Sequence, residues 1–314
     1  MRERGFNKRG TDVVMILYGV IVHGGAGSPS QFSDGCRKAC EAAFHLLEKG
    51  NDSLDAVTEA ARILEDDGRF NAGSGSALRL DGKTIEMDAS VMDSEGNVGI
   101  VMTIRNVKNP VLVARAVMDT PHVALSGEGA TAFARRKGFE PFYSVSQYAL
   151  ERYRKLKQLI KQGELAKISP IWEGYDIESL WNFENLPYRE TFCDTIGAVA
   201  IDKNGVFAVA NSTGGFSPML LGRVGDSAMI GCGFYAGPYG AVAATGAGEE
   251  IIRRMLTKNV YDMISRGEDI KEACRKGIEM FPPEIKVGII AISKKGFSVV
   301  ANTEMANYAL IKEK

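Results

Sequence analysis

One strand–turn–strand pattern occurs twice in the second half of the chain, and it limits the folds that this sequence can adopt. Residues 200–211 and 291–302 are identical at seven of twelve aligned positions. In both segments a short polar turn that contains a glycine separates two apolar stretches, which is typical of a β-hairpin. We therefore expect two similar hairpins that lie together in one antiparallel layer.

Helical patterns surround these strands. Residues 33–49 place apolar side chains on one face at helical spacing, namely Cys36, Cys40, Ala43, Phe44 and Leu47. A second helix is expected over 53–64 with Ser53 as its N-cap, and others over 248–265 and 270–280. Residues 87–92 and 98–104 predict another hairpin. This order of elements indicates layered sheets covered by helices on both faces.

The bulk composition is that of a globular protein. The chain has 314 residues, 45% of them hydrophobic, which allows one large domain or two small ones and excludes a collagen-like or disordered chain. Thirty-eight Lys and Arg residues nearly balance 39 Asp and Glu residues, so the net charge is −1. This charge gives no support for a nucleic-acid or membrane partner.

Two segments are expected to lie outside the compact fold. An apolar run over 13–22 follows basic residues as in a signal peptide, but a glycine loop comes directly after it, so we interpret the run as a first buried strand. Residues 1–14 then become a frayed extension, with Met15 as an alternative first residue. Residues 143–194 are rich in charge and predict a linker, whose part 148–167 has the pattern of a basic amphipathic helix.

The cysteines and histidines exclude several common kinds of site. Five cysteines without a CxxC pair do not form a disulfide framework, which favours a reducing, cytoplasmic location. Three scattered histidines offer neither zinc-ligand spacing nor a Ser-His-Asp arrangement, and no phosphate-binding loop is present. We expect His45 to be structural and His23 to fasten the glycine loop rather than to catalyse a reaction.

The most informative motifs are one glycine loop near the start of the chain and four segments that begin where the linker ends. They are, in order, His-Gly-Gly-Ala-Gly at 23–27, Asp194-Thr195 at the start of an apolar strand, Ser-Thr-Gly-Gly at 212–215, Gly-Arg-Val-Gly-Asp-Ser at 222–227 and Thr-Gly-Ala-Gly-Glu at 245–249. The ordered set resembles the asparaginase and isoaspartyl peptidase family of N-terminal nucleophile hydrolases, whose nearest relatives are the glycosylasparaginases. The resemblance runs from about Met15 to Tyr308.

The resemblance implies a four-layer αββα sandwich, in the α+β class, and activation by self-cleavage. The precursor would cut itself between Asp194 and Thr195 into an α subunit, 1–194, and a β subunit, 195–314, that together form one structural domain. Cleavage would free the Thr195 α-amino group, whose ordinary pKa of about 7.7–8.0 suits a general base near neutral pH. The nucleophile would then carry its own base, which accounts for the missing histidine.

The resemblance also assigns roles to individual residues. Thr213 would polarise the nucleophile, and the Thr245 hydroxyl and Gly246 N–H would form an oxyanion hole. Arg223 would bind an α-carboxylate and Asp226 an α-ammonium group. The implied substrate site also includes Val224, Gly225, Gly248 and Asn71. A structural sodium ion would be bound by backbone carbonyls of a loop that includes Leu64, Glu65, Asp67, Phe70, Ala72 and Ser74, and no cofactor would be required for the chemistry.

The implied reaction is hydrolysis of β-aspartyl amides, either L-asparagine or β-aspartyl dipeptides, by a dimer of αβ heterodimers. Two features depart from the family pattern. Asp194 replaces the glycine that many asparaginases have before the threonine, and 216–221 lacks the usual polar and basic residues. A glycosylasparaginase, a threonine endopeptidase and an uncleaved, inactive binding homologue therefore remain as alternatives.

Overall fold

The computed structural model describes residues 15–79, 81–161, 175, 180, 182 and 195–314 of the chain. The expected N-terminal extension, 1–14, and Asp194 lie outside these residues, as does most of the expected linker. The basic amphipathic helix is present as α5 (Gln147–Lys161). No helix within the described ranges is long and apolar enough to cross a lipid bilayer.

The larger sheet is made mainly of antiparallel strands. Its order is β11-β1-β5-β6-β2-β3-β4, and only β3 and β4 pair in parallel. The strands are β1 (Ile16–His23), β2 (Met87–Asp93), β3 (Val98–Ile104), β4 (Ala124–Ser126), β5 (Thr195–Ile201), β6 (Phe207–Thr213) and β11 (Asn307–Glu313). The hairpin expected over 87–104 is confirmed as β2–β3.

The smaller sheet contains the second copy of the repeated hairpin. Its order is β10-β9-β8-β7, with β7 (Phe234–Gly237), β8 (Gly240–Gly246), β9 (Val287–Ser293) and β10 (Gly296–Ala301). The repeated segments form β5–β6 and β9–β10, so both are hairpins, but the expectation that they share one layer is wrong. A hairpin pattern specifies only local pairing, and here each copy joins a different sheet.

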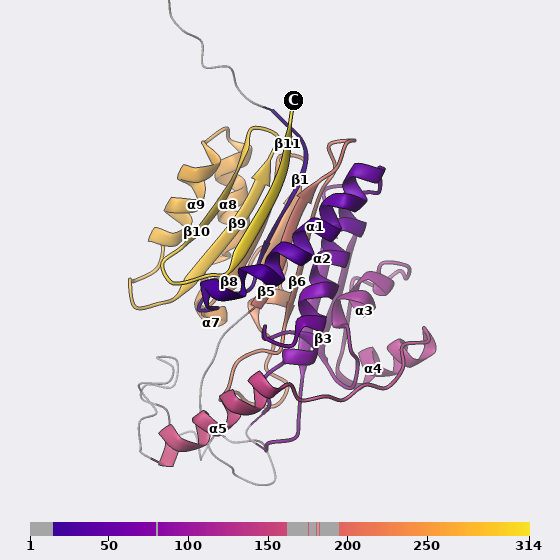
Figure 1. Cartoon of the computed structure of the whole chain (residues 1–314), viewed down its shortest axis with the longest axis vertical. Coiled ribbons are helices and arrows are strands. Elements are labelled where there is room, and N and C mark those ends of the chain that lie inside the picture. Colours follow the sequence, from indigo (N-terminus) through magenta and orange to yellow (C-terminus); the bar gives the residue numbers. More distant parts are fainter. Residues whose placement is uncertain (1–14, 80, 162–174, 176–179, 181, 183–194) are drawn as a thin grey trace, which may run out of the picture.

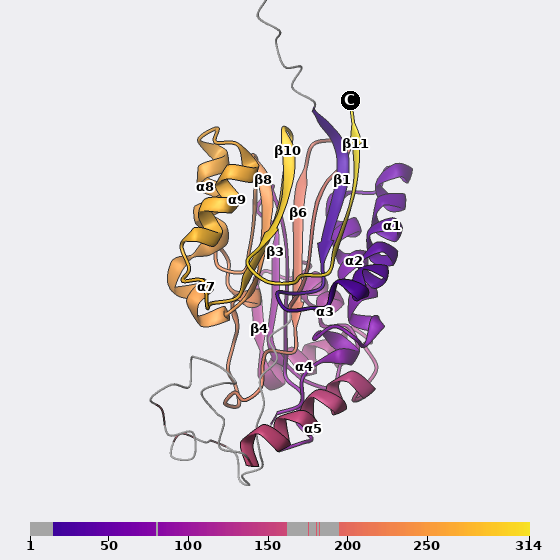
Figure 2. The ribbon, with the colours of Figure 1, turned by 60° about the vertical axis from the view of Figure 1, so that its left-hand side comes forward.

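The two sheets pack face to face, with helices against their outer faces (Figure 2). Val199 and Ile201 of β5 pack with Ile290 and Ile292 of β9 in the apolar layer between the sheets. Alternate residues point the other way, so Ala198 lies in the apolar cluster on the side of β5 that faces α2. Strands buried on both faces read as continuous apolar runs, as these do. The expected sandwich of two sheets and helices is thus present.

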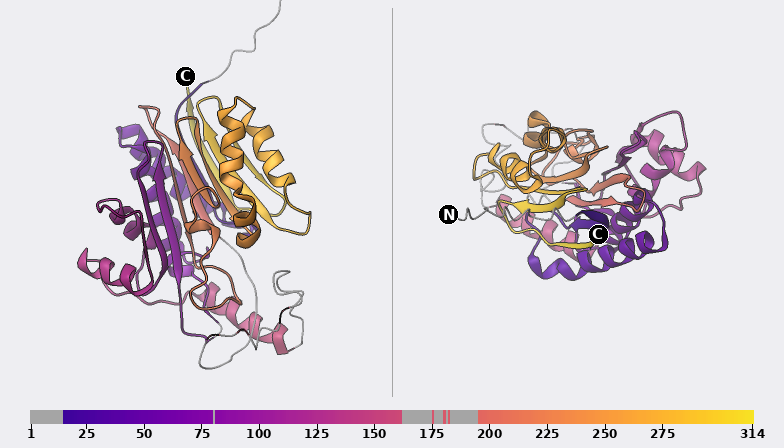
Figure 3. Two further views of the ribbon diagram at one scale, coloured as in Figure 1. Left: turned by 180° about the vertical axis from the view of Figure 1, so that it is seen from behind. Right: turned by 90° about the horizontal axis from the view of Figure 1, so that it is seen from above.

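Helices pack against the outer faces of both sheets, except α5, which lies beyond the ends of the strands (Figure 1). They are α1 (Ser33–Lys49), α2 (Ser53–Asp67), α3 (Pro110–Val117), α4 (Gly127–Arg136), α5, α7 (Gly248–Arg254), α8 (Leu256–Ser265) and α9 (Ile270–Glu279), with 3-10 turns at Ser30–Phe32, Gly73–Gly75 and Asp226–Ala228. Helices α1 and α2 pack against the larger sheet (Figure 1), and α8 and α9 lie over the outer face of the smaller sheet (Figure 3).

Three details of the helices differ from the predictions. The N-cap of α2 is Asp52 rather than Ser53, because the Asp52 carboxylate accepts the backbone N–H of Asp55 at 2.7 Å. The helix expected over 248–265 is interrupted at Met255, whose positive φ of 44° separates α7 from α8. His45 is exposed on α1 and faces Glu48, so it is not part of the core.

Candidate active site

The site is built where strands of both sheets end. Thr195 is the first residue of β5 and pairs directly with Thr213, the last residue of β6. In the smaller sheet, β8 ends with Thr245 and Gly246. The antiparallel pairing of β5 and β6 therefore brings together two threonines that lie at opposite ends of this hairpin in the sequence.

A small pocket lies beside Thr195. It is lined by Thr195, Thr213, Gly215, Phe216, Arg223, Asp226 and Gly246. The side chains of Thr195 and Thr213 are almost fully buried, and the Thr195 hydroxyl oxygen accepts a long hydrogen bond of 3.4 Å from the Ser227 hydroxyl. The structure thus gathers five of the expected site residues around one space, although they come from four separate motifs.

Arg223 is held by Glu249, a residue to which the sequence motifs assigned no role. Its Nε and Nη2 atoms donate to the two carboxylate oxygens of Glu249, both at 2.9 Å, and its guanidinium lies 4.5 Å from the centre of the Phe216 ring. This two-point pairing is the strong geometry for arginine and carboxylate. Glu249 therefore orients the guanidinium at the pocket wall.

Asp226 is a buried carboxylate that lacks one hydrogen-bond partner. Its Oδ2 atom has none within the described residues, and desolvation raises the pKa of Asp226 to about 7 despite the opposing attraction of Arg223. Gly248 keeps this corner open, since an added Cβ would lie 2.6 Å from Arg223 Nη2 and 2.8 Å from Asp226 Oδ1. Arginine and carboxylate thus meet at one end of the pocket.

Gly246 lines the pocket, and Thr245 precedes it on β8 with its side chain fully buried. The φ of Gly246 is 135°, and an added Cβ would lie 2.2 Å from the Lys286 carbonyl oxygen, so only glycine fits there. The Thr245 hydroxyl is fully buried and accepts the backbone N–H of Ala26 at 3.1 Å. This bond attaches the first glycine loop, 23–27, to the end of β8.

Asn71 and Arg79 support the turn that follows Thr213. Asn71 donates to the Gly215 carbonyl and accepts the Ala77 N–H at 2.8 Å, while the buried Arg79 donates to the Gly214 carbonyl at 2.9 Å. Neither residue lines the pocket. Arg79 was missed by the sequence analysis because a single arginine outside any motif gives no signal.

The remaining expected residues surround this arrangement. Gly225 donates its N–H to Asp88 Oδ2 at 3.0 Å, and Val224 packs against the layer between the sheets. His23 is fully buried, and the loss of solvation lowers its pKa to about 3, so the imidazole is neutral near pH 7. It lies against Gly197 of β5, where an added Cβ would be 2.4 Å from its Nε2 atom.

Backbone carbonyls at the end of α2 and in the loop after it lie close to the glycines of that loop. An added Cβ at Gly73 would lie 2.7 Å from the Glu65 carbonyl oxygen, and one at Gly75 would lie 1.9 Å and 2.8 Å from the oxygens of Phe70 and Gly68. Carbonyl oxygens are the donors that hard cations prefer. The residues present therefore suit a hard cation. The side chain of Asp67, whose backbone carbonyl the resemblance assigned to the ion, pairs with Arg69.

The Glu65 side chain is fully buried next to this loop. Its Oε1 atom accepts the Ser212 hydroxyl at 2.6 Å and the Val111 N–H at 3.0 Å, and desolvation raises the pKa of Glu65 from 4.5 to about 8. Ser212 precedes Thr213 on β6. Glu65 is thus a neutral acid near pH 7 that joins α2 to the strand that carries Thr213.

Glu65 is expected to make stability depend on pH. Between about pH 4.5 and 8 the unfolded chain loses the Glu65 proton while the folded chain keeps it. The free energy of unfolding is therefore highest below pH 4.5 and decreases as the pH rises to 8. The decrease is at most about 1.4 kcal/mol per pH unit. Glu65→Gln should flatten this decline in unfolding curves recorded from pH 5 to 8. Glu59→Gln, at a part-exposed position of α2, is the control. An unchanged slope in Glu65→Gln would contradict the assignment.

Comparison with known proteins identifies the family. The family model described as asparaginase matches residues 15–314. The chain belongs to the asparaginase family. A plant-type L-asparaginase of Thermococcus kodakarensis is 39% identical over 308 residues, which cover 94% of this chain and 96% of that protein. An isoaspartyl peptidase/L-asparaginase of Xenopus laevis is 35% identical over 305 residues, 94% of this chain and 92% of that protein. This asparaginase-family chain is a hydrolase, as its relatives are.

Proposed function

We propose that this chain is a threonine amidohydrolase of β-aspartyl amides, activated by self-cleavage. The observation that carries the proposal is the position of Thr195. It begins a buried strand in a pocket that also contains Thr213, Gly246, Arg223 and Asp226. Membership in the asparaginase family supports the same function.

Maturation would begin with the Thr195 hydroxyl. Its oxygen attacks the carbonyl carbon of Asp194, the peptide nitrogen leaves as the new α-amino group, and an ester replaces the amide. Water then hydrolyses this ester and restores the hydroxyl. The products are fragments 1–194 and 195–314, and the free amine becomes the base for turnover.

Turnover would use the same hydroxyl on an external amide. The amine accepts the hydroxyl proton, the oxygen attacks the β-carbonyl carbon, and the leaving amine departs with a proton. The Gly246 N–H, with the Thr245 hydroxyl, would stabilise the negative oxygen of the tetrahedral intermediate, a donor effect of about 3 kcal/mol. Water then releases aspartate from Thr195.

The substrates would be L-asparagine and β-aspartyl dipeptides. Arg223 can bind the α-carboxylate while Glu249 fixes its orientation, and the unpartnered oxygen of Asp226 can accept an α-ammonium group. Both groups lie at the end of the Thr195 pocket. The plant-type and isoaspartyl peptidase names of the relatives agree with these two substrates.

Two further features belong to the proposal. The carbonyls around Gly73 and Gly75 would hold a structural sodium ion, which takes no part in the chemistry. The two fragments would remain associated in one structural domain, and two such heterodimers would form a dimer.

The test is maturation together with substrate turnover. Purified protein should yield two fragments by intact mass, the smaller beginning at Thr195, and should then hydrolyse L-asparagine and β-aspartyl dipeptides. Glycosylated asparagine tests the glycosylasparaginase alternative. A protein that remains one chain and hydrolyses none of these would overturn the proposal.

A further inference from the structure

One face of β2 carries three polar side chains at alternate positions. Asp88 and Ser90 lie within the strand, and Glu86 continues the alternation just before it. Side chains at this spacing share one face of a sheet, because successive residues of a strand point to opposite faces. All three residues are buried and are at most 3% exposed. Buried polar groups are normally hydrogen-bonded, and these three bind a single loop.

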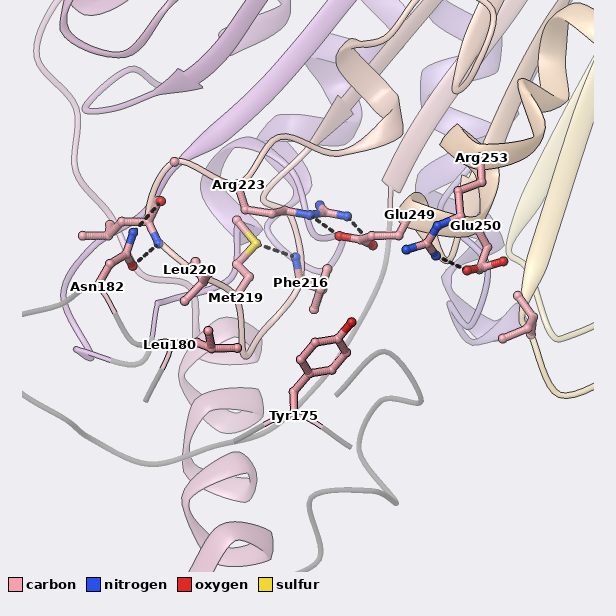
Figure 4. A pocket seen from close by; sticks show the side chains of 13 residues that line it. Tyr175, Leu180, Asn182, Phe216, Met219, Leu220, Arg223, Glu249, Glu250 and Arg253 are labelled. Atoms are coloured by element: carbon pink, nitrogen blue, oxygen red, sulfur yellow. Dashed lines mark hydrogen bonds and ion pairs between the residues drawn. The ribbon is translucent and has the colours of Figure 1, made fainter. Parts of the chain in front are cut away.

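That loop is the segment 222–227, which contains Arg223 and Asp226. Each of the three side chains forms a hydrogen bond with its backbone: Glu86 Oε2 accepts the Gly222 N–H at 3.0 Å, Asp88 Oδ2 accepts the Gly225 N–H at 3.0 Å, and the Ser90 hydroxyl donates to the Ser227 carbonyl at 2.6 Å. Arg223 extends from this loop to Glu249 of α7 (Figure 4). Strand β2 therefore holds both ends and the middle of the loop that would bind the head group of the substrate.

Asp88 also lies in register with the two threonines of the pocket. It pairs with Thr213 across β2 and β6, and Thr213 pairs with Thr195 across β6 and β5. Residues directly opposite each other on neighbouring strands point to the same face of a sheet. The three residues thus form one row, with Thr195 at one end and Asp88 at the other. Asp88 is not among the described residues that line the Thr195 pocket, so any effect on the substrate must pass through the loop.

The second oxygen of Asp88 is bound from the neighbouring strand. Oδ1 accepts the Thr103 N–H of β3 at 2.8 Å. The β2–β3 register shifts between Met87 and Ala89, so that two residues of β3 lie opposite Asp88 alone, and Thr103 has a positive φ of 48°, which is rare for a β-branched residue. Such a β-bulge turns backbone groups out of the regular ladder. The bulge therefore provides the N–H that fixes the Asp88 carboxylate under the loop.

We infer that Asp88 is a positioning residue, which sets the separation of Arg223 and Asp226 and hence the fit of the α-carboxylate and α-ammonium groups of the substrate. The inference rests on the proposed function and adds to it a determinant of affinity outside the pocket. The N–H that Asp88 binds belongs to Gly225, between the two charged residues in the sequence. A shift of this one backbone group would change their separation.

Asp88→Asn tests this role. An amide has one acceptor oxygen, so its NH₂ group would face one of the two N–H donors. We expect the variant to mature into two fragments, because Arg223 and Asp226 take no part in the proposed self-cleavage. KM for L-asparagine should rise about tenfold or more, whereas kcat should fall less than about threefold. The inhibition constant of L-aspartate should rise with KM, since this product carries the same head group and reports binding apart from the chemical steps.

Asp93→Asn is the matched control. Asp93 is a buried carboxylate at the end of the same strand, and it accepts the N–H groups of Glu95 and Asn97 at 2.9 and 3.0 Å in the hairpin turn. This variant should unfold at a lower temperature than the native protein but keep the native KM and inhibition constant. Rates are expressed per mole of released β fragment, so a loss of folded enzyme does not enter the comparison.

Three results would overturn the inference. One is an Asp88→Asn enzyme that matures and keeps the native KM and inhibition constant. Another is an equal rise of both constants in Asp93→Asn, which would make the effect a general one of buried carboxylates. The third is an Asp88→Asn protein that remains one chain, which would assign Asp88 to folding or to self-cleavage instead. Failure of the proposed function would differ from all three, because the native protein itself would release no fragment and hydrolyse no L-asparagine.

Discussion

Replacing Thr195 by alanine is expected to leave a single chain of about 34.0 kDa and to reduce L-asparagine hydrolysis at least about a thousand-fold. Alanine has no hydroxyl to attack the Asp194 carbonyl, so neither the ester nor the free amine can form. The methyl group of alanine fits the space of the threonine side chain, whose hydroxyl accepts a long hydrogen bond of 3.4 Å from Ser227 in the described part of the chain. Intact mass and an ammonia-release assay measure the two effects.

Thr195→Ser is the matched control for this experiment. Serine keeps the hydroxyl and, after cleavage, the α-amino group, so fragments should still form and activity should fall far less than in Thr195→Ala. Ser212→Ala alters the neighbouring hydroxyl that binds Glu65 and should permit cleavage. If Thr195→Ala produced a fragment beginning at residue 195, the hydroxyl would not be the attacking group, and the mechanism would have to be withdrawn.

Much of the secondary structure could be predicted from the sequence because local patterns determine it. Helix α1 has the expected bounds, and the β2–β3 hairpin forms around the expected turn. The assignment of strands to sheets could not be predicted in this way. Strands β5, β6 and β9 of the two similar hairpins are buried on both faces, and nothing in an apolar run tells whether its neighbour is a helix or a second sheet.

The residues of the candidate site that belong to sequence motifs could be named from the sequence. The contacts that only the fold creates, between segments far apart in the chain, could not. Thr195, Thr213, Arg223, Asp226 and Gly246, which the family resemblance grouped together, line one pocket. The Glu249 pairing and the support of Gly214 by Arg79 join segments distant in sequence, and such contacts leave no periodicity or spacing.

Asp226→Asn is expected to lower kcat/KM on L-asparagine by about a hundredfold while making the folded protein more stable. Asparagine removes the charge that would pair with the substrate ammonium group inside a buried site, where loss of one partner is costly. Yet that charge is unfavourable in the free protein, since one carboxylate oxygen has no partner among the described residues. Function and stability should therefore change in opposite directions.

The pH dependence follows from the raised pKa of Asp226. Between its ordinary value of 3.8 and about 7, the unfolded chain releases the proton while the folded chain retains it, so stability declines by up to about 1.4 kcal/mol per pH unit and stays low above pH 7. At pH 8 the asparagine variant should unfold a few degrees higher than the native protein. Below pH 7 the native kcat/KM should fall because this carboxyl becomes neutral and because the Thr195 α-amine is protonated, so the decline should be less steep in the variant but still present.

Asp202→Asn is the control that distinguishes loss of the charge at the substrate site from the general effect of neutralising a buried carboxylate. Asp202 is equally buried, but its carboxylate accepts backbone N–H groups of Ser53, Asn204 and Val206 at 2.9–3.1 Å, so the substitution should lower stability and leave the pH profile of kcat/KM unchanged. Thermal unfolding at pH 5 and 8 and initial rates across this range measure both variants. If Asp226→Asn instead lost stability as well as activity, Asp226 would be a structural residue and the ammonium site would have to lie elsewhere.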